Sequence, residues 1–400
     1  MTRILIIAAA AVSLAAHASA QPAPWGPERT TAGWTFTPGV ALGTLWDTNV
    51  TLVNVGNPRE EELVGLVNPR GELQYNGRHT RFNAGYSGAL EAYKTLDALN
   101  RYEQRSRASL QRQFSERLQL ESSASYAVSP TTDRVELGAL PFVDIGTRTF
   151  EANGVIKYVM SPRTAIDAAY QFQRVRFDRE DQPLAFLNGG HAHSPAVRLT
   201  RSLSTRLGVG GEWQYRHATL EGAEHAFGVH NLLGTVGYQA GPSTSISGAV
   251  GVSSLRALGA EATDAATDWG PALRAGIEHQ VRRVSLSARY FRSFVPSFSF
   301  GGLTASQQFS ATVRAPLTTG GRLTASGTTS FSRTSPVEAL GLGYQSDSVA
   351  IHGAVEYQFA PWLRTEGFVT STHHNSSARG DFDRLRIGIQ FVTSKPVRIE

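Results

Sequence analysis

The stretch Arg384–Phe391, RLRIGIQF, decides the fold class because its side chains change character at every second residue. The odd positions from Leu385 to Phe391 are large and apolar, whereas the even positions are charged, polar or glycine. Successive side chains of a β-strand point to opposite faces, so this period of two predicts a strand with one apolar and one polar face. The same alternation recurs from Trp34 onward in runs of 10 to 14 residues. Soluble strands average about 5–6 residues and a tilted membrane strand needs about 9–11, so this length favours a membrane-spanning sheet.

Tight-turn sequences, such as Asn76–Arg78, Ser161–Arg163 and Gly320–Arg322, recur at steps of 38 to 46 residues and alternate with longer irregular connections. A β-propeller also repeats at about 40–45 residues, but each blade would divide the period into four short strands. One tight turn and one longer connection per period instead predict two long strands. Eight turns and nine loops then give eighteen strands. We predict an all-β fold, a transmembrane antiparallel β-barrel of about 18 strands (16–18), with short periplasmic turns and long extracellular loops.

The composition agrees with a membrane barrel. The 400 residues are 41% hydrophobic and 18% charged and include no cysteine, which excludes disulfides, cysteine-ligated zinc and thiol nucleophiles. The mean hydropathy of −0.21 is far from that of a helical membrane protein. A membrane barrel is compatible with this low mean hydropathy, because its apolar residues occupy only every second position of each strand.

The N-terminus reads as an export signal. Residues 1–20 combine a cationic start, an apolar run from Ile4 to Ala16 and the small-residue exit Ala18–Ala20, which predicts a secretory signal peptide cleaved after Ala20. The run is too short for a spanning helix, which needs about 20 apolar residues. We expect a short periplasmic segment at 21–32, the barrel at 33–392, a C-terminal tail at 393–400, and a location in the outer membrane among its lipids.

The polar faces of the predicted strands carry charges that a soluble core would not tolerate unpaired but that suit a water-filled lumen. Basic residues outnumber acidic ones there, which favours an anion-selective lumen; the alternative is that arginines and glutamates pair across strands and cancel. Phe291 and Phe368 also fall on this face, where they would stack on sugars or mark strand bulges. The predicted lumen-lining residues are Arg81, Glu103, Arg105, Arg107, Glu151, Lys157, Arg198, Glu212, Arg216, Arg274, Glu278, Arg289, Arg314, Glu356, Arg364 and Glu366.

Catalytic and metal motifs are not evident. His191 with His193, and His373 with His374, are the close histidine groups, and both are predicted to lie on loops without a carboxylate pair at ligand spacing. No Gly-x-Ser-x-Gly elbow, phosphate-binding loop or dinucleotide fingerprint occurs. The formal charge of +5, or +4 once Arg3 leaves with the signal peptide, is too small and dispersed for nucleic acid binding. We therefore expect no enzyme activity, no cofactor and no nucleic-acid partner.

The first predicted strand ends on the motif aromatic-Asp-x-Asn-apolar, formed by Trp46, Asp47, Asn49 and Val50. With this motif and its hairpin repeat, the chain resembles the outer-membrane β-barrel porin families, and within them the Wzp-type barrels associated with exopolysaccharide export. The resemblance implies a channel that passes exopolysaccharide and works with a periplasmic polysaccharide-export protein. Two alternatives remain open: a general or anion-selective diffusion porin, and a non-conducting surface barrel for adhesion or envelope anchoring. The chain departs from many such barrels by continuing for nine residues after Phe391.

Overall fold

A computed structural model describes residues 33–130, 145–178, 189–221, 226–258, 267–298, 302–337, 345–377 and 380–399. The predicted signal peptide at 1–20, its cleavage after Ala20 and the segment 21–32 lie outside the described residues. Eighteen long strands and one short strand make up nearly all of the described residues. The only helical element in these residues is the short 3-10 turn η1 (Asp97–Leu99). Within these ranges no helix has the length and apolar character needed to cross a membrane.

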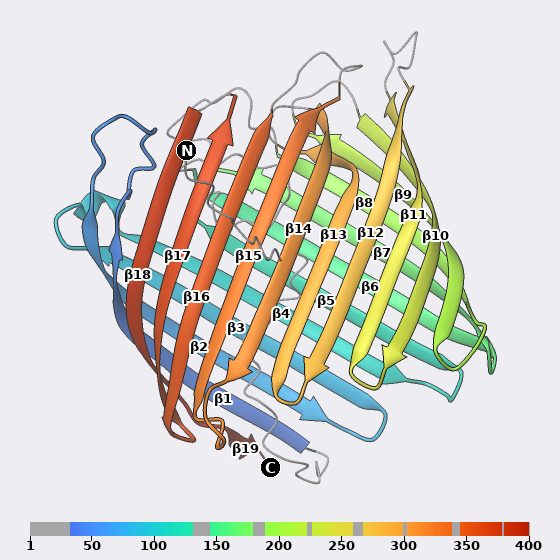
Figure 1. The fold of residues 1–400 in the computed structure, drawn as a ribbon, viewed down its shortest axis with the longest axis horizontal. Helices are drawn as coiled ribbons and strands as arrows, with labels where there is room; N and C mark the ends of the chain where they lie inside the picture. The colour runs from blue at the N-terminus through green and yellow to red at the C-terminus, as the bar shows by residue number, and fades with distance from the viewer. Residues whose placement is uncertain are drawn as a thin grey trace, which may run out of the picture.

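The strands form one antiparallel sheet that closes on itself, because β1 pairs with both β2 and β18 (Figure 1). This confirms the predicted eighteen-stranded antiparallel barrel. Apart from the pairings of β1 with β18 and with the short β19, neighbours in the barrel wall are also neighbours in sequence. The strands are β1 (Gly33–Asp47), β2 (Glu62–Asn76), β3 (Thr80–Tyr93), β4 (Arg101–Gln113), β5 (Leu118–Ser129), β6 (Thr147–Ser161), β7 (Thr164–Phe177), β8 (Gly190–Ser202), β9 (Leu207–Leu220), β10 (Ala226–Gly241), β11 (Thr244–Leu258), β12 (Thr267–Val281), β13 (Val284–Ser297), β14 (Gly302–Pro316), β15 (Leu323–Pro336), β16 (Ser346–Ala360), β17 (Leu363–Ser376), β18 (Gly380–Ser394) and β19 (Val397–Ile399).

The tight turns gather at one end of the barrel and the longer connections at the other (Figure 1). Two of the turns are stabilised by a serine side chain in the same way. The Ser115 hydroxyl accepts the N–H groups of Arg117 and Leu118, and Ser204 does the same for Arg206 and Leu207. A serine that satisfies the backbone in this way stabilises a turn without help from distant residues, which is why these turns are readable from sequence.

The pairing register separates the sheet into two faces, because directly paired residues lie on the same side. Trp46 pairs with Ile387 and Leu42 with Phe391, and all four side chains are exposed large hydrophobics on the outer face. The alternation is kept through all eighteen strands and returns to β1 in phase. A soluble monomer does not expose an apolar belt of this extent, so the belt faces lipid, where the closed sheet also satisfies the backbone.

The C-terminal residues stay within the sheet. β18 continues to Ser394, and β19 pairs with Trp34–Phe36 at the start of β1. Its apolar residues Val397 and Ile399 are among the exposed hydrophobics, like their partners on β1. The residues after 392, which the sequence analysis separates as a tail, therefore add a short strand at the turn end of the barrel.

Candidate functional site

The register places all sixteen predicted lumen residues on the inner face, opposite the apolar belt. Lys157, Asp167, Arg198 and Glu212 illustrate this, because they are successive cross-strand partners on β6, β7, β8 and β9. The sixteen are distributed around the wall as Arg81 on β3; Glu103, Arg105 and Arg107 on β4; Glu151 and Lys157 on β6; Arg198 on β8; Glu212 and Arg216 on β9; Arg274 and Glu278 on β12; Arg289 on β13; Arg314 on β14; Glu356 on β16; and Arg364 and Glu366 on β17.

Two inner-wall charges on β2, Arg70 and Glu72, are not among the predicted lumen-lining residues. Arg70 pairs with Ser87 and Glu72 with Gly85, both on the inner face of β3, and Glu72 Oε1 accepts a hydrogen bond from Asn83 Nδ2 at 2.7 Å. The alternation is hard to read here because Pro69 and Gly71 interrupt it. One feature of the sequence could have found them: Arg70 and Glu72 are an even number of residues from Glu62, at the beginning of the strand, and therefore lie on the same face.

Glu212 lies at the centre of a charged triad on the inner wall. Its carboxylate is 5% exposed, and Arg198 and Arg274 each donate to a different oxygen at 2.6 Å. Two guanidinium groups therefore share one carboxylate. Other inner-wall pairs include Arg289 with Glu278 at 3.0 Å, so much of the lumen charge is compensated, as the paired alternative expects.

Several of the lumen arginines have no carboxylate partner among the described residues. Within the described ranges, none of Arg81, Arg107 and Arg314 has an ion pair. They lie on separate strands, β3, β4 and β14, so their positive charges are spread around the wall. A surplus of this kind attracts anions into a water-filled channel whose walls have a low dielectric constant.

The Glu212→Gln variant is expected to make the lumen more selective for anions, because it leaves Arg198 and Arg274 without their carboxylate. In a tenfold KCl gradient, we expect the reversal potential of single channels to move toward the chloride limit by on the order of 10 mV, against about 59 mV for perfect selectivity. Asp347→Asn, which changes a carboxylate on the outer face, is the control. A shift toward cations in Glu212→Gln would contradict this charge assignment.

The loop end of the β13–β14 hairpin leaves the barrel wall. The β12–β13 ladder ends at the pair of Leu273 with Arg292, and beyond it β13 continues with β14 alone. Pro271 lies on β12 just past this last pair. Proline has no N–H to give to a ladder and is confined in sheets to edges and irregular points, so β12 cannot pair regularly here.

The freed end of the hairpin reaches over the inner wall. β13 contacts β10 and β11, which are not its ladder neighbours. The Ser293 hydroxyl donates to Asn231 Oδ1 on β10 at 3.1 Å, and the Gly189 N–H donates to the Phe298 carbonyl at 3.0 Å. Since Gly189 precedes β8, this last bond joins segments five strands apart around the barrel. The hairpin therefore extends across the loop end of the lumen.

Apolar packing holds the hairpin in this position. Phe294 and Phe298 pack into a cluster of buried side chains from the inner wall, and the Phe294 ring lies over Gly270, where a Cβ would be 2.9 Å from Cζ. Each buried phenyl ring contributes about 1.5–3 kcal/mol. We call this cluster the apolar cap; its members are Ile145, Val175, Phe177, Ala192, Ala218, Leu220, Phe227, Val229, Leu255, Phe294, Phe298 and Val337.

A cavity of about 570 Å³ lies in the lumen on the turn side of the apolar cap. It is lined by the charged side chains Arg198, Arg274, Glu278 and Arg289, together with Phe291. Phe291 pairs with Arg274 and Gln308 in unbroken ladders, so it faces the lumen without a bulge. Phe368 likewise pairs in register with Ala354 and Gly388. The bulge interpretation of these two aromatics is therefore wrong.

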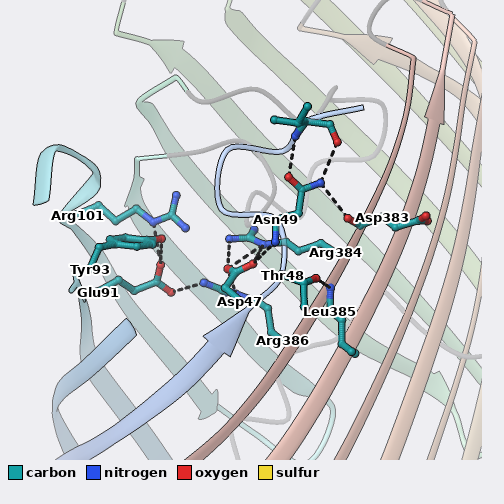
Figure 2. A network of polar contacts seen from close by, with 11 residues as sticks. Asp47, Thr48, Asn49, Glu91, Tyr93, Arg101, Asp383, Arg384, Leu385 and Arg386 are labelled. Atoms are coloured by element: carbon teal, nitrogen blue, oxygen red, sulfur yellow. Dashed lines mark hydrogen bonds and ion pairs between the residues drawn. The ribbon is translucent and has the colours of Figure 1, made fainter. Parts of the chain in front are cut away.

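The motif residues lie where the first and last strands meet, at the loop end (Figure 2). Asp47 is fully buried and accepts hydrogen bonds from Arg384 Nη2 at 2.7 Å and Arg386 Nε at 2.9 Å. Arg386 also binds Glu91, which in turn binds Arg101 (Figure 2). Buried charges are tolerated only when they are paired in this way.

Asn49 fixes the connection after β1. Its amide accepts the Val53 N–H at 2.8 Å and donates to the carbonyls of Val53 and Asp383, each at 2.9 Å (Figure 2). Val50 is buried with Leu45 and Tyr93 in a second apolar cluster on the inner wall. Trp46 points outward into the apolar belt. The motif thus fastens strand ends and a connection, and its one charged residue, Asp47, faces inward.

The histidine pairs lie on strands, so their predicted loop positions are wrong. His191 and His193 belong to β8, and His373 and His374 belong to β17. The strands extend further toward the loop end than the apolar alternation suggests, because histidines replace large apolar residues there. Within the described ranges, no group of three or more His, Asp or Glu side chains could hold a metal ion.

The closed antiparallel sheet, its apolar outer belt and its charged inner wall define a transmembrane β-barrel with an internal lumen. No protein-family model matches the chain and no curated protein matches it in sequence. The solved structures similar to it include the outer membrane protein OpdK of Pseudomonas aeruginosa, with 12% identity, a TM-score of 0.45 and coverage of 90% of this chain and 99% of that one. OccK9 (OpdG) of Pseudomonas aeruginosa has 11% identity, a TM-score of 0.46 and coverages of 90% and 98%. OccAB4 of Acinetobacter baumannii has 9% identity, a TM-score of 0.44 and coverages of 92% and 100%.

Proposed function

We propose that the protein is an outer-membrane channel through which small polar or anionic solutes diffuse. The observation that carries this proposal is the 570 Å³ cavity on the turn side of the apolar cap, with charged side chains along its lining. Sites for small molecules in proteins have volumes of about 300–1,000 Å³. The uncompensated Arg81, Arg107 and Arg314 favour anions among these solutes.

Polysaccharide export is a less favoured function. A hydrated polymer needs a continuous polar path, along which it exchanges hydrogen bonds with water and wall at little net cost. The hairpin of β13 and β14 and the apolar cap lie across the loop end of the lumen and offer apolar groups there. Export of a polymer and the partnership with a periplasmic polysaccharide-export protein therefore remain predictions from the resemblance alone.

Solute uptake by reconstituted barrels tests the proposal. In liposomes that contain the purified protein, we expect fast swelling with monosaccharides and small organic anions and no measurable swelling with long oligosaccharides. The hairpin of β13 and β14 and the apolar cap lie across the loop end and narrow the lumen there, which is the physical reason for this cut-off. Equal swelling with long oligosaccharides would favour the polymer conduit, and no swelling with any solute would favour the non-conducting surface barrel.

A further inference from the structure

Basic side chains gather on the outer face of the barrel at the loop end of β6 to β11. They share the outward parity of the apolar belt, since their sequence neighbours Val175, Ala192, Ala218 and Val229 are buried in the apolar cap. A lipid-facing surface is otherwise the least suitable place for charge, so this concentration requires an explanation. We call the set the basic band; it consists of Arg148, Arg174, Arg176, His191, His193, His217, His230 and Arg256.

The register makes the basic band continuous across six strands. His193 pairs with His217, His217 with Gly228, and Gly228 with Arg256, so these residues form one row on β8 to β11. One step further toward the loops, Arg174 pairs with His191. Gly228 itself is buried, with Tyr215 Oη and Leu258 Cδ1 within 3.4 Å of where its Cβ would lie, so these two side chains fill the row between His217 and Arg256.

Aromatic rings lie directly beside the band. Tyr170 Oη and His193 Nδ1 are 2.6 Å apart, and the rings of Tyr215 and His230 have centroids 4.5 Å apart. Trp213, next along β9, is 42% exposed on the apolar belt. Tyrosine and tryptophan girdles mark the two interfaces of a membrane barrel. The basic band therefore lies at the level of the lipid headgroups on the loop side.

The carboxylates near the band compensate it unevenly: Arg148 has a close partner in Asp178 at 3.1 Å, whereas Arg174 and Arg176 share the more distant Glu221. Glu221 lies 3.8 Å from Arg174 and 3.9 Å from Arg176, which is beyond hydrogen-bond distance. Arg256 has no ion pair with any residue of the described ranges. These guanidinium groups retain donors for an external anion, and the exposed fractions of Arg174 and Arg176, 42% and 56%, make them accessible.

The outer face at the loop end of β15 to β18 is different. Arg333 donates to both oxygens of Asp347, at 2.7 and 3.0 Å, and His373 Nδ1 lies 2.6 Å from Asp383 Oδ1. Each basic group here has a close carboxylate of its own. The basic band is therefore a local feature and not a general property of this rim.

We propose that the basic band binds the phosphate groups of a phosphorylated glycolipid in the outer leaflet of the outer membrane. Arginine guanidiniums at headgroup depth complement the phosphates, histidine N–H groups donate hydrogen bonds to them, and the neighbouring apolar belt packs against the acyl chains. The proposal rests on the membrane placement proposed above, but not on which solute the lumen carries.

The test compares lipid binding by the full-length barrel and two variants in detergent, with bound lipid counted by native mass spectrometry. The probes are bis-phosphorylated lipid A, chemically dephosphorylated lipid A and inorganic phosphate. Removing two phosphate-binding charges in the double variant Arg174→Gln/Arg256→Gln is expected to weaken binding of the phosphorylated lipid about tenfold or more. Arg333→Gln, at the same depth on the other side of the barrel, should bind as the parent does.

Three results would overturn the proposal: equal binding of dephosphorylated lipid A, equal loss in Arg333→Gln, or no lipid A bound by the parent barrel. Displacement of the lipid by millimolar inorganic phosphate would assign the band to free phosphate instead. Heat-modifiable gel migration is recorded for every sample to show that each variant is folded. Membrane placement is tested apart from lipid binding, by the fractionation of the protein with outer membranes, and the channel is tested by the swelling assay.

Discussion

The Asp47→Ala variant is expected to unfold with a free energy about 3–5 kcal/mol lower than that of the parent barrel, because breaking a buried ion pair leaves an uncompensated charge. Asp47 is fully buried, and its partners Arg384 and Arg386 are only 6% and 15% exposed. Arg386 keeps its contact with Glu91, so the loss falls mainly on Arg384, which donates to both oxygens of Asp47. The loss falls at the meeting of β1 and β18, so it weakens the contact that closes the sheet. Urea titration in lipid vesicles, followed by tryptophan fluorescence, measures the change.

Asp347→Ala is the matched control for this prediction. It also removes a carboxylate from an arginine, but the pair is at the outer surface and Arg333 is 47% exposed. Exposed pairs contribute about 0–1 kcal/mol, so this variant should be close to the parent in stability. Equal stability losses in the two variants would show that burial of Asp47 does not govern closure of the barrel.

The second large effect is expected from the double variant Phe294→Ala/Phe298→Ala, which removes both hairpin rings from the apolar cap. Each such truncation in a packed cluster costs about 3–5 kcal/mol, enough to change the ratio of docked to released hairpin more than about 100-fold. We expect the single-channel conductance to rise and the solute cut-off in the swelling assay to move to larger sugars. Phe309→Ala, on the outer face of the same hairpin, should leave both unchanged.

Gly270→Val provides an independent route to the same state. A Cβ at this position would be 2.9 Å from Phe294 Cζ, so the ring must shift away from β12. Conductance should then rise as in the double variant, although the apolar cap keeps all its side chains. An unchanged conductance in both variants would mean that the hairpin does not restrict the lumen.

The strand number and the two faces of the sheet could be predicted from sequence because both are local. In β18 the side-chain parity alone separates Leu385 from Arg386, and turns such as the one at Ser204 satisfy their backbone within a few residues. The sixteen lumen residues follow from the same parity. Nothing beyond neighbouring residues is needed to find them.

The contacts across the barrel could not be predicted, because they join segments far apart in the chain. The partners of Asp47 are more than 300 residues away, and no local pattern pairs them. Phe294 reads as an ordinary strand residue until the early end of the β12–β13 ladder is known. The sequence predicts a loop at the histidines of β8 for a related reason: at the headgroup level, apolar alternation no longer marks the strand.

The departure of β13 from the wall also limits how deep the barrel can sit in its bilayer. From Asp268 to Ala272, β12 has a ladder partner only in β11, so one edge of this backbone segment depends on water or polar headgroups. Hydrocarbon can supply neither, and the acyl chains must therefore end near the pair of Leu273 with Arg292. Trp269, on this segment and 65% exposed, then lies at the membrane–water interface. The part of the wall between this level and the turn end sets the bilayer thickness that the barrel can span.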